Sequence, residues 1–433
     1  MPADDASQSA ANPDLAGQSS AATSKRERIQ RLYGEYWSPR LVTTTYMLVY
    51  LTEGAVRSLG IFLPFYLSER FGLGPADIGF FVAAAYIAWH FKFIIGLVMD
   101  LTPSVRGWRR RMYLMAGNVM RMVGFFLLAR AADPWRQAFP AALIIFSGDA
   151  LLDIAADALL LDVTPPDYHG MGFGFGWGGR AIGYSLSALF VTWAVSRFGW
   201  DGAISLMALY TIPAFAMAAV REPPLTEERR INKRVLALTF TDPRLLAAVI
   251  FAIFGASVYS FDPNRGVFSL VIKELSGRSL RGGGLASVAF GLAVAVGSPI
   301  TGMLADRIGH KRAYYFSLAG AAASLAGMSL LTPERVWLMY PLSFALGFFE
   351  GFNFTTWATV LGDLCPPEFP SFLFQYFMSM LHVSAYLTAV FVGWGIEALG
   401  PRMTVLLSAL YISMGFIPAY FVRPLATGKA ERI

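Results

Sequence analysis

The amino-acid sequence predicts an all-α membrane protein with twelve transmembrane helices in two pseudo-symmetric six-helix bundles. Of its 433 residues, 55% are hydrophobic and 15% are charged, whereas a soluble protein carries about 25% charged residues. Apolar runs of about 20 residues recur along the chain, and each is long enough to cross the roughly 30 Å hydrocarbon core of a membrane. The two halves of the chain also repeat the same short motifs, which predicts two structurally similar halves.

The twelve apolar runs define the expected organisation of the chain. They cover residues 41–68, 75–99, 112–131, 138–163, 171–197, 201–220, 244–274, 284–304, 313–332, 336–362, 371–398 and 402–422. We therefore expect a disordered cytoplasmic tail at 1–40, a first bundle at 41–221, a cytoplasmic linker at 222–242, a second bundle at 243–423 and a cytoplasmic tail at 424–433. The start of the chain lacks a basic region followed by an apolar core, so it does not resemble a secretory signal.

The placement of Lys and Arg predicts the orientation in the membrane. With the N-terminus inside, the cytoplasmic segments hold 21 of the 35 Lys and Arg residues, the outer loops hold 9 and the helices hold 5. Because cytoplasmic loops carry the excess of positive charge, we expect both termini in the cytoplasm and a multi-pass protein of the cytoplasmic (inner) membrane. The basic clusters lie beside helix ends, where anionic lipid and topology explain them, so the net charge of +6 predicts no nucleic-acid partner.

The fourth run carries three carboxylates inside an otherwise apolar stretch. Asp149, Asp153 and Asp157 are spaced four residues apart, which places them on one helix face about 80° wide. A carboxylate at the centre of a spanning helix costs roughly 2.5–3.5 kcal/mol, so three on one face are expected to meet a water-filled cavity or cations. The candidate intramembrane cations are Arg57, Lys92, Arg121, Arg180 and Arg265. Asp149 and Asp153 also have a structural interpretation, as partners of Arg121 or Arg180, and any cation left over would suit an anionic substrate.

Further charged residues in the apolar runs complete the candidate site. Glu53 and Arg57 lie four residues apart on one helix face and are expected to pair. Pro263 must break the hydrogen-bond ladder of the seventh run beside Asp262 and Arg265. In the register of the two halves, Glu350 corresponds to Asp149. The candidate proton-coupling and substrate-cavity residues are Glu53, Arg57, Lys92, Asp149, Asp153, Asp157, Arg180, Asp262, Arg265 and Glu350.

A second motif follows the second and eighth runs. In the second half it reads GxLxDRxGxKR, and its residues include Gly302, Asp306, Arg307, Lys311 and Arg312. The related form in the first half consists of Gly96, Asp100, Arg109 and Arg110. Glycine lets two helices approach, and the basic side chains can clamp an acidic group on a neighbouring helix end. Such a clamp forms in one state of a transport cycle and breaks in the other, so we expect a gating role; a basic loop that only sets topology is the alternative.

These motifs resemble those of the major facilitator superfamily, and the resemblance covers residues 41 to 423. The segment from Asp153 to Asp162 is similar to the D-x-x-x-D-A segment of folate–biopterin transporters, as is the stretch from Lys92 to Asp100. The same acidic segment, with Gly179 to Gly183 and the Gly199–Trp200 pair, is similar to AmpG-like muropeptide permeases and their acetyl-CoA transporter relatives. The resemblance implies a two-bundle fold with its cargo site between the halves, and both kinds of cargo stay open.

Several patterns that suggest other chemistry are rejected. Gly174-x-Gly176-x-x-Gly179 matches a dinucleotide fingerprint, but no strand precedes it, so we expect no cofactor. Its glycines instead form small-residue faces for close helix contact, Gly170/Gly174/Gly178 and Gly179/Gly183. Cys365 is the only cysteine, and no metal-ligand spacing, Ser–His–Asp set or Walker motif is present, so we expect no metal site and no enzymatic activity. His90 and His382 can titrate near neutral pH, but a lone histidine in a helix is more often packed.

The predicted function is secondary active transport by alternating access, coupled to protons. The cargo is an anionic or zwitterionic organic solute, pterin/folate-like or muropeptide-like, and the partners are this solute, protons and the lipid bilayer, with the protein acting as a monomer. Asp157 is the predicted proton carrier, with Asp153 held ionised by an arginine. One alternative is a non-transporting membrane assembly factor of the PucC-like, pigment-handling kind, although such a scaffold does not require an expensive charged centre. A membrane-embedded enzyme is the third possibility and lacks a catalytic set.

Overall fold

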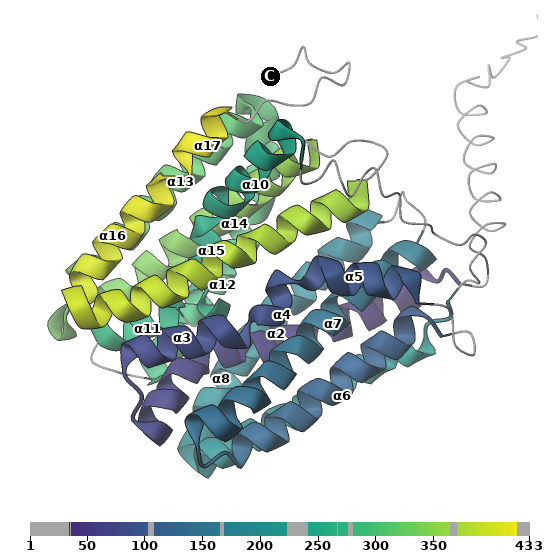
Figure 1. Cartoon of the computed structure of the whole chain (residues 1–433), viewed down its shortest axis with the longest axis horizontal. Helices are drawn as coiled ribbons and strands as arrows, with labels where there is room; N and C mark the ends of the chain where they lie inside the picture. The colour runs from purple at the N-terminus through teal and green to yellow at the C-terminus, as the bar shows by residue number, and fades with distance from the viewer. Residues whose placement is uncertain are drawn as a thin grey trace, which may run out of the picture.

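The computed structural model describes residues 34, 36–102, 108–164, 169–222, 241–265, 267–275, 280–363 and 370–421. Within these ranges every regular element is a helix (Figure 1). Most of the predicted N-terminal tail and of the central linker, the whole C-terminal tail and Cys365 lie outside the described residues. The twelve passes confirm the predicted fold class.

The first six passes run from α2 to η3. Their elements are α2 (Pro39–Phe71), α3 (Pro75–Ala85), α4 (Ile87–His90), α5 (Lys92–Leu101), α6 (Arg110–Ala129), η1 (Pro134–Ala138), α7 (Phe139–Val163), α8 (His169–Tyr210) and η3 (Ile212–Ala219). The second pass is interrupted twice, at Tyr86 and Phe91, so it consists of α3, α4 and α5. The long α8 contains two passes that meet at Gly199, whose φ of 68° lies in the left-handed region that favours glycine.

The last six passes repeat this plan. Their elements are α10 (Pro243–Gly255), η4 (Ser257–Phe261), η5 (Pro263–Arg265), α11 (Val267–Leu275), α12 (Leu280–Ile308), α13 (His310–Gly327), η6 (Met328–Leu330), η7 (Pro333–Leu338), α14 (Met339–Asp363), α15 (Pro370–Leu399), α16 (Pro401–Ser413) and α17 (Phe416–Phe421). As predicted, the seventh pass is broken before and at Pro263, into two short 3₁₀ turns between α10 and α11.

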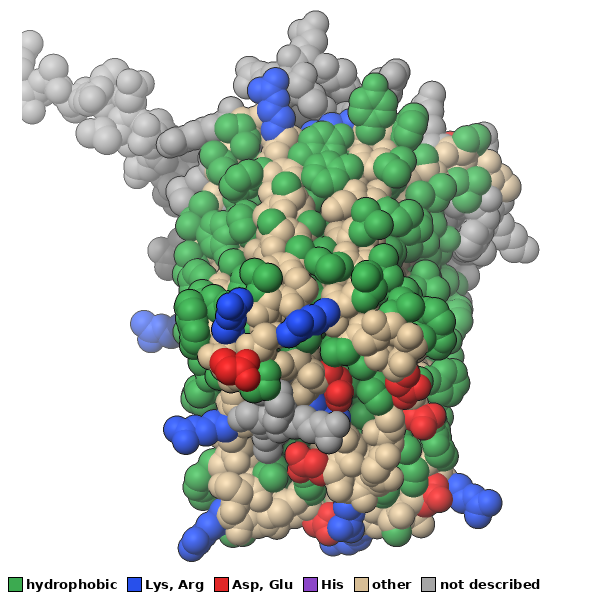
Figure 2. All heavy atoms as spheres, turned by 90° about the vertical axis from the view of Figure 1, so that its left-hand side faces the viewer, with side chains coloured by type: hydrophobic (Ala, Val, Ile, Leu, Met, Phe, Trp, Pro, Cys, Tyr) green, Lys and Arg blue, Asp and Glu red, His purple; other side chains and the backbone are tan. Residues whose placement is uncertain are grey.

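Six helical segments among the described residues are long and apolar enough to cross a membrane by themselves. They are Arg40–Phe71, Arg110–Ala129, Gly179–Ala219, Arg281–Ser298, Gln375–Leu399 and Pro401–Phe421. Other passes are shortened by the turns described above, and α7 carries the predicted carboxylates. Large hydrophobic side chains such as Trp193, Leu292 and Leu410 are exposed on the outside. Hydrophobic side chains also cover much of the face in Figure 2, while acidic and basic ones gather in its lower half.

Glycines bring the backbones of α2 and α8 into direct contact. A Cβ atom added at Gly179 would lie 2.5 Å from the carbonyl oxygen of Met47, and one added at Gly183 would collide with that of Leu51. On the other helix, a Cβ atom at Gly54 would collide with the carbonyl oxygen of Arg180. The predicted close contact is therefore present at Gly179 and Gly183, whereas the surroundings of Gly170, Gly174 and Gly178 lie outside the described part of α8.

The two halves contact each other at one end of the molecule, which we call the far end. It holds the α2–α3 and α15–α16 turns and lies opposite the start of α2 (Figure 1). Here α3 lies along α15 (Figure 1). A Cβ atom on Gly79 would lie 2.5 Å from the carbonyl oxygen of Ala389. The Glu397 carboxylate also accepts a 2.9 Å hydrogen bond from the backbone N–H of Ala76. At the same end α8 packs against α12, where a Cβ atom added at Gly284 would lie 2.9 Å from Thr192 Oγ1.

Candidate functional site

A buried charge centre lies where α2, α7 and α8 meet in the first half. The contact between α2 and α8 brings Arg180 beside Glu53, and Glu53 is completely buried. One oxygen of Glu53 accepts hydrogen bonds from Arg57 Nε at 3.0 Å and Nη2 at 2.6 Å. Its other oxygen accepts one from Arg180 Nη2 at 2.6 Å. The predicted Glu53–Arg57 pair is therefore present, and a second arginine from α8 completes it.

Asp149 is held by two arginines at the α6 side of this centre. Arg121 Nη1 donates to it at 3.1 Å, and Arg57 Nε lies 3.9 Å from its other oxygen. Arg121 is itself fixed, because its Nη2 donates to Thr52 at 3.0 Å and to Asn118 at 2.5 Å. Of the two structural partners expected for Asp149, the structure therefore selects Arg121.

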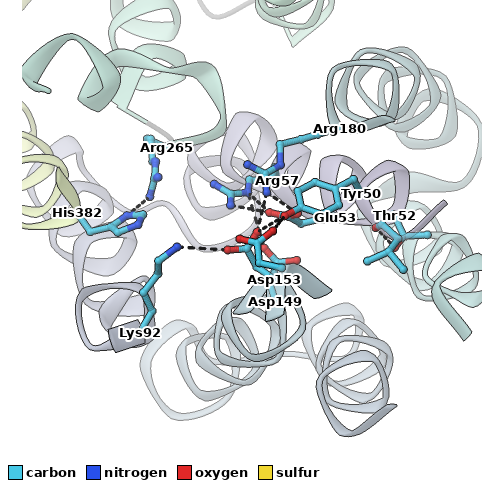
Figure 3. A network of polar contacts seen from close by, with 12 residues as sticks. Tyr50, Thr52, Glu53, Arg57, Lys92, Asp149, Asp153, Arg180, Arg265 and His382 are labelled. Atoms are coloured by element: carbon cyan, nitrogen blue, oxygen red, sulfur yellow. Dashed lines mark hydrogen bonds and ion pairs between the residues drawn. The ribbon is translucent and has the colours of Figure 1, made fainter. Parts of the chain in front are cut away.

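Asp153 lies at the middle of the centre and joins it to the second pass. Arg180 Nη2 donates to Asp153 at 2.7 Å, and Lys92 Nζ lies 3.4 Å from its other oxygen. Figure 3 shows Lys92 reaching Asp153 from the side opposite Arg57 and Arg180. Lys92 is the first residue of α5, so the interruption at Phe91 determines where this cation enters the site. Asp153 is thus held by two cations, one of them an arginine, and its permanent ionisation stays a prediction.

Asp157 has a different environment from the other two acids of α7. The Tyr46 hydroxyl donates to it at 2.6 Å, and the Tyr50 hydroxyl donates to the same oxygen. Among the described residues, no Lys or Arg side chain lies within ion-pair distance of Asp157. Arg180 therefore does not lie between Asp153 and Asp157, which was one arrangement considered from the sequence; it joins Asp153 to Glu53 instead.

The two tyrosines are functional candidates that the sequence analysis missed. Tyr46, Tyr50, Glu53 and Arg57 follow helical spacing, so all four project from one face of α2. Tyr50 also contacts Asp153, at 3.3 Å, and therefore touches both carboxylates. Listing the polar residues at this spacing along the first run would have found them.

The charges of this centre balance among the described residues. Its carboxylates are Glu53, Asp149, Asp153 and Asp157, and its cations are Arg57, Lys92, Arg121 and Arg180. Four negative and four positive groups give a net charge of zero when all are ionised. One bound proton would leave the centre with a charge of +1.

The second half contributes a smaller group of buried charges. The Tyr259 hydroxyl of η4 accepts a 3.4 Å hydrogen bond from Arg57 and links the two halves. Arg265 is buried and its Nη1 lies 2.8 Å from Nδ1 of His382. Glu350 is buried on α14 without a hydrogen bond or ion pair to any described residue, whereas the half-buried Asp262 lies at the turn between η4 and η5. Among the described residues Glu350 therefore lacks the two arginine partners that its counterpart Asp149 has.

The first-half gating motif holds an acidic helix end, as its sequence predicts. Arg109 Nη2 binds Asp162, near the end of α7, and Arg110 Nε donates to the same oxygen at 3.1 Å. The sequence did not predict Glu222, whose carboxylate accepts the backbone N–H groups of Arg109, Arg110 and Arg111 at 2.7–3.0 Å and so caps α6. Gly96 faces Ile154 of α7.

The second-half motif is described only in part. The side chains of Asp100, Asp306 and Arg307, and the surroundings of Gly302, lie outside the described residues. Lys311 is half-buried and Arg312 is exposed at the start of α13. Gly309 precedes them with a φ of 89°, which explains why the motif has glycine there. The gating role of both motifs stays a prediction.

A helical fold of twelve passes with a charge centre buried in its first half is typical of one class of protein, the polytopic membrane transporters. The family model for the Major Facilitator Superfamily matches residues 42–276 and 264–432, so this chain belongs to that superfamily. The predicted membership is confirmed.

Comparison with individual proteins gives more distant similarities. The chain is 27% identical over 143 residues to the folate-biopterin transporter of Synechocystis sp., a match that covers 32% of this chain and 29% of that protein. It is 23% identical over 323 residues to multidrug resistance protein MdtG of Salmonella choleraesuis, covering 72% of this chain and 78% of that protein. Neither relative gives support to the assembly-factor alternative.

Solved structures agree on the fold. A bacterial homologue of the human lysosomal transporter Spinster, in an inward-facing and occupied conformation, superimposes with a TM-score of 0.69 at 13% identity, covering 90% of this chain and 97% of that one. The D-xylose–proton symporter gives a TM-score of 0.70 at 14% identity, covering 88% and 96%. The family match, together with this fold, makes the chain a multi-pass membrane transporter of the Major Facilitator Superfamily.

Proposed function

We propose that this transporter couples the movement of an anionic or zwitterionic organic solute to protons, and that Asp157 carries the proton. The observation that carries the proposal is the contrast within α7. Asp149 and Asp153 each meet two cations, whereas Asp157 meets only the hydroxyls of Tyr46 and Tyr50 among the described residues. Neutralising Asp157 therefore breaks no ion pair, whereas neutralising either of the others breaks two.

The charge balance of the centre supports coupling to an anion. A proton on Asp157 changes the net charge of the eight groups from zero to +1, which attracts a negatively charged solute. Tyr50 donates to Asp157 and lies beside Asp153, so the protonation of Asp157 changes the hydrogen bond that this hydroxyl makes. Asp153 in turn binds Lys92 and Arg180. Proton binding then favours anion binding, which is the positive coupling that proton–anion symport requires.

The class of cargo rests on similarity and on charge. The relative from Synechocystis is named for folate and biopterin, and its match favours a pterin/folate-like solute. A muropeptide-like solute stays the second member of the same anionic or zwitterionic class. With both termini in the cytoplasm, as the placement of Lys and Arg predicts, the far end, where α3 packs against α15, faces outward.

Uptake into proteoliposomes tests this proposal. Purified protein would be reconstituted and given radiolabelled folate, biopterin or a muropeptide, with and without an imposed pH gradient. We expect accumulation of at least one of these solutes that requires the gradient and disappears when a protonophore collapses it. Accumulation that ignores the protonophore, or none with any of the three, would contradict the proposal.

A further inference from the structure

Arg265 is a buried cation with two nitrogens that lack a hydrogen-bond partner among the described residues. Its side chain is only 3% exposed, yet its Nε and Nη2 atoms have no hydrogen-bond partner in the described structure. No Asp or Glu side chain of the described ranges lies within ion-pair distance of it. The four cations of the first-half centre, in contrast, each contact a carboxylate. Buried polar groups in proteins are nearly always partnered, so such an exception requires an explanation.

The remaining nitrogen of Arg265 has a well-defined neighbour. Nη1 lies 2.8 Å from Nδ1 of His382. A guanidinium can only donate, so Nδ1 is the accepting, unprotonated nitrogen of a neutral imidazole. The Tyr259 ring lies under the guanidinium at 4.4 Å, and the Tyr86 ring from the first half lies 5.4 Å away. His382 and the two aromatic rings therefore fix the orientation of Arg265 without neutralising its charge.

The free atoms lie in the geometry that binds a carboxylate. Nε–H and the outer N–H of Nη2 share one edge of the planar guanidinium and point the same way, which is the arrangement that grips both oxygens of a carboxylate. The bond to His382 uses the opposite nitrogen and leaves this edge available. In Figure 3 Arg265 and His382 lie apart from the acids of α7, so this edge does not belong to the first-half network.

We propose that Arg265 binds the carboxylate of the cargo through Nε and Nη2, and that His382 is a positioning residue for it. This inference rests on the proposed function and specifies a carboxylate-bearing solute. Tyr259 stacks on Arg265 and accepts a hydrogen bond from Arg57, so the cargo carboxylate lies one side chain away from the charge centre. A solute bound here contacts both halves of the transporter.

The first experiment needs no ligand. Replacing a buried charge that has no ion-pair partner should not lower the stability of the protein, whereas replacing a paired one should lower it. Unfolding temperatures would be measured for purified, ligand-free Arg265→Gln and Arg121→Gln. Arg121 is the matched control, since it is equally buried but bonded to Asp149, Thr52 and Asn118. We expect Arg265→Gln to equal or exceed the wild type and Arg121→Gln to fall by several degrees. A fall in Arg265→Gln as large as that in Arg121→Gln would overturn the inference and make Arg265 structural.

The second experiment uses folate, which has carboxylates, and biopterin, which has none. Binding would be followed by tryptophan fluorescence in the wild type, Arg265→Gln, Arg265→Lys and the exposed control Arg136→Gln. Folate affinity should fall at least about tenfold in both Arg265 variants, because lysine keeps the charge but not the two-pronged geometry, and biopterin affinity should not change. His382→Ala should weaken folate binding and His382→Gln should restore it. Unchanged folate binding by Arg265→Gln would overturn the inference, and if neither probe binds the wild type the unfolding temperatures decide.

The experiments can contradict the proton-coupling proposal and the carboxylate-site proposal independently of each other. If folate binds through Arg265 but never accumulates under a pH gradient, proton coupling is wrong and the carboxylate site stands. If gradient-driven uptake survives in Arg265→Gln, the carboxylate site is wrong and the transport function stands.

Discussion

The Tyr46 hydroxyl donates a 2.6 Å hydrogen bond to Asp157, a carboxylate that no Lys or Arg in the described ranges contacts. One and two helical turns earlier, Asp153 and Asp149 are each held by two cations. Three acids on one helix face therefore have two different environments. This difference is the reason why we propose Asp157 as the proton carrier, whereas the ion pairs of the other two acids join α7 to α2, α5, α6 and α8.

The hydroxyl groups of Tyr46 and Tyr50 should set the pH range of transport. Both donate to Asp157 and so stabilise its ionised form. In Tyr46→Phe or Tyr50→Phe that stabilisation is lost, so the proton stays bound at higher pH and the pH profile of uptake should move toward alkaline values. Uptake rates between pH 5 and pH 9 would measure the shift.

Tyr66→Phe is the control for these variants, because its hydroxyl donates to the backbone oxygen of Leu128 and not to the charge centre. Its pH profile should match the wild type. A profile that stays in place in both Tyr46→Phe and Tyr50→Phe would argue against Asp157 as the coupling group.

The clamp between Asp162 and the two arginines should control the rate of the cycle. Asp162→Asn removes the charge that Arg109 and Arg110 share, so transport should slow severalfold while folded protein remains in the membrane. Asp306→Asn is expected to act similarly through the second-half motif. Initial uptake rates at matched expression measure both.

Asp201→Asn provides the comparison, because Asp201 also pairs with an arginine, Arg70, but on the exposed surface. Exposed pairs contribute little, typically about 0–1 kcal/mol, so this variant should behave as the wild type. Equal rates for Asp162→Asn and Asp201→Asn would count against a gating clamp.

The contact between α2 and α8 should be destabilised when a glycine at this contact is replaced by alanine. Gly183→Ala places a Cβ atom against the carbonyl oxygen of Leu51, so we expect a loss of about 1–3 kcal/mol of stability and a lower unfolding temperature. At Gly96 the nearest atom to an added Cβ is Ile154 Cγ2 at 3.6 Å, an ordinary contact, so Gly96→Ala should unfold near the wild-type temperature. Equal unfolding temperatures for the two variants would show that the backbones can separate.

The orientation predicted from Lys and Arg can be tested with reporter fusions. A reporter that functions only in the cytoplasm should be active when it is fused at Thr226, in the predicted linker, or after Ile433. A reporter that functions only in the periplasm should be silent at both sites. Activity of the periplasmic reporter at either site would reverse the assignment of the far end to the outside.

Much of the fold could be predicted because each membrane-spanning segment must be apolar over about 20 residues, and such a run can be found in the sequence without knowing the rest of the structure. The predicted run 138–163 matches α7 closely, and the interruption at Pro263 appears where a missing N–H requires it. The interruptions at Tyr86 and Phe91 were not predicted, since neither residue breaks a helix by itself. They depend on packing between passes, and one of them places Lys92.

The candidate site was predictable in its charges but not in its pairing. Spacing placed Glu53 beside Arg57, because both lie on one helix. Whether Arg180 meets Glu53 depends on how closely α8 approaches α2, and that distance follows from Gly54, Gly179 and Gly183 together. Tyr46 and Tyr50 were missed because a tyrosine in an apolar run resembles any other aromatic residue until its hydroxyl has a partner.

The central claim is that Asp157 carries the coupled proton, and a comparison of accumulation with exchange tests it most directly. Proteoliposomes containing the wild type, Asp157→Asn or the exposed control Asp201→Asn would be loaded with the solute identified by the uptake assay. We predict that Asp157→Asn no longer accumulates solute under an imposed pH gradient but still exchanges labelled for unlabelled solute, while Asp201→Asn does both. Uphill accumulation by Asp157→Asn under the same gradient would contradict the account and place the proton site elsewhere.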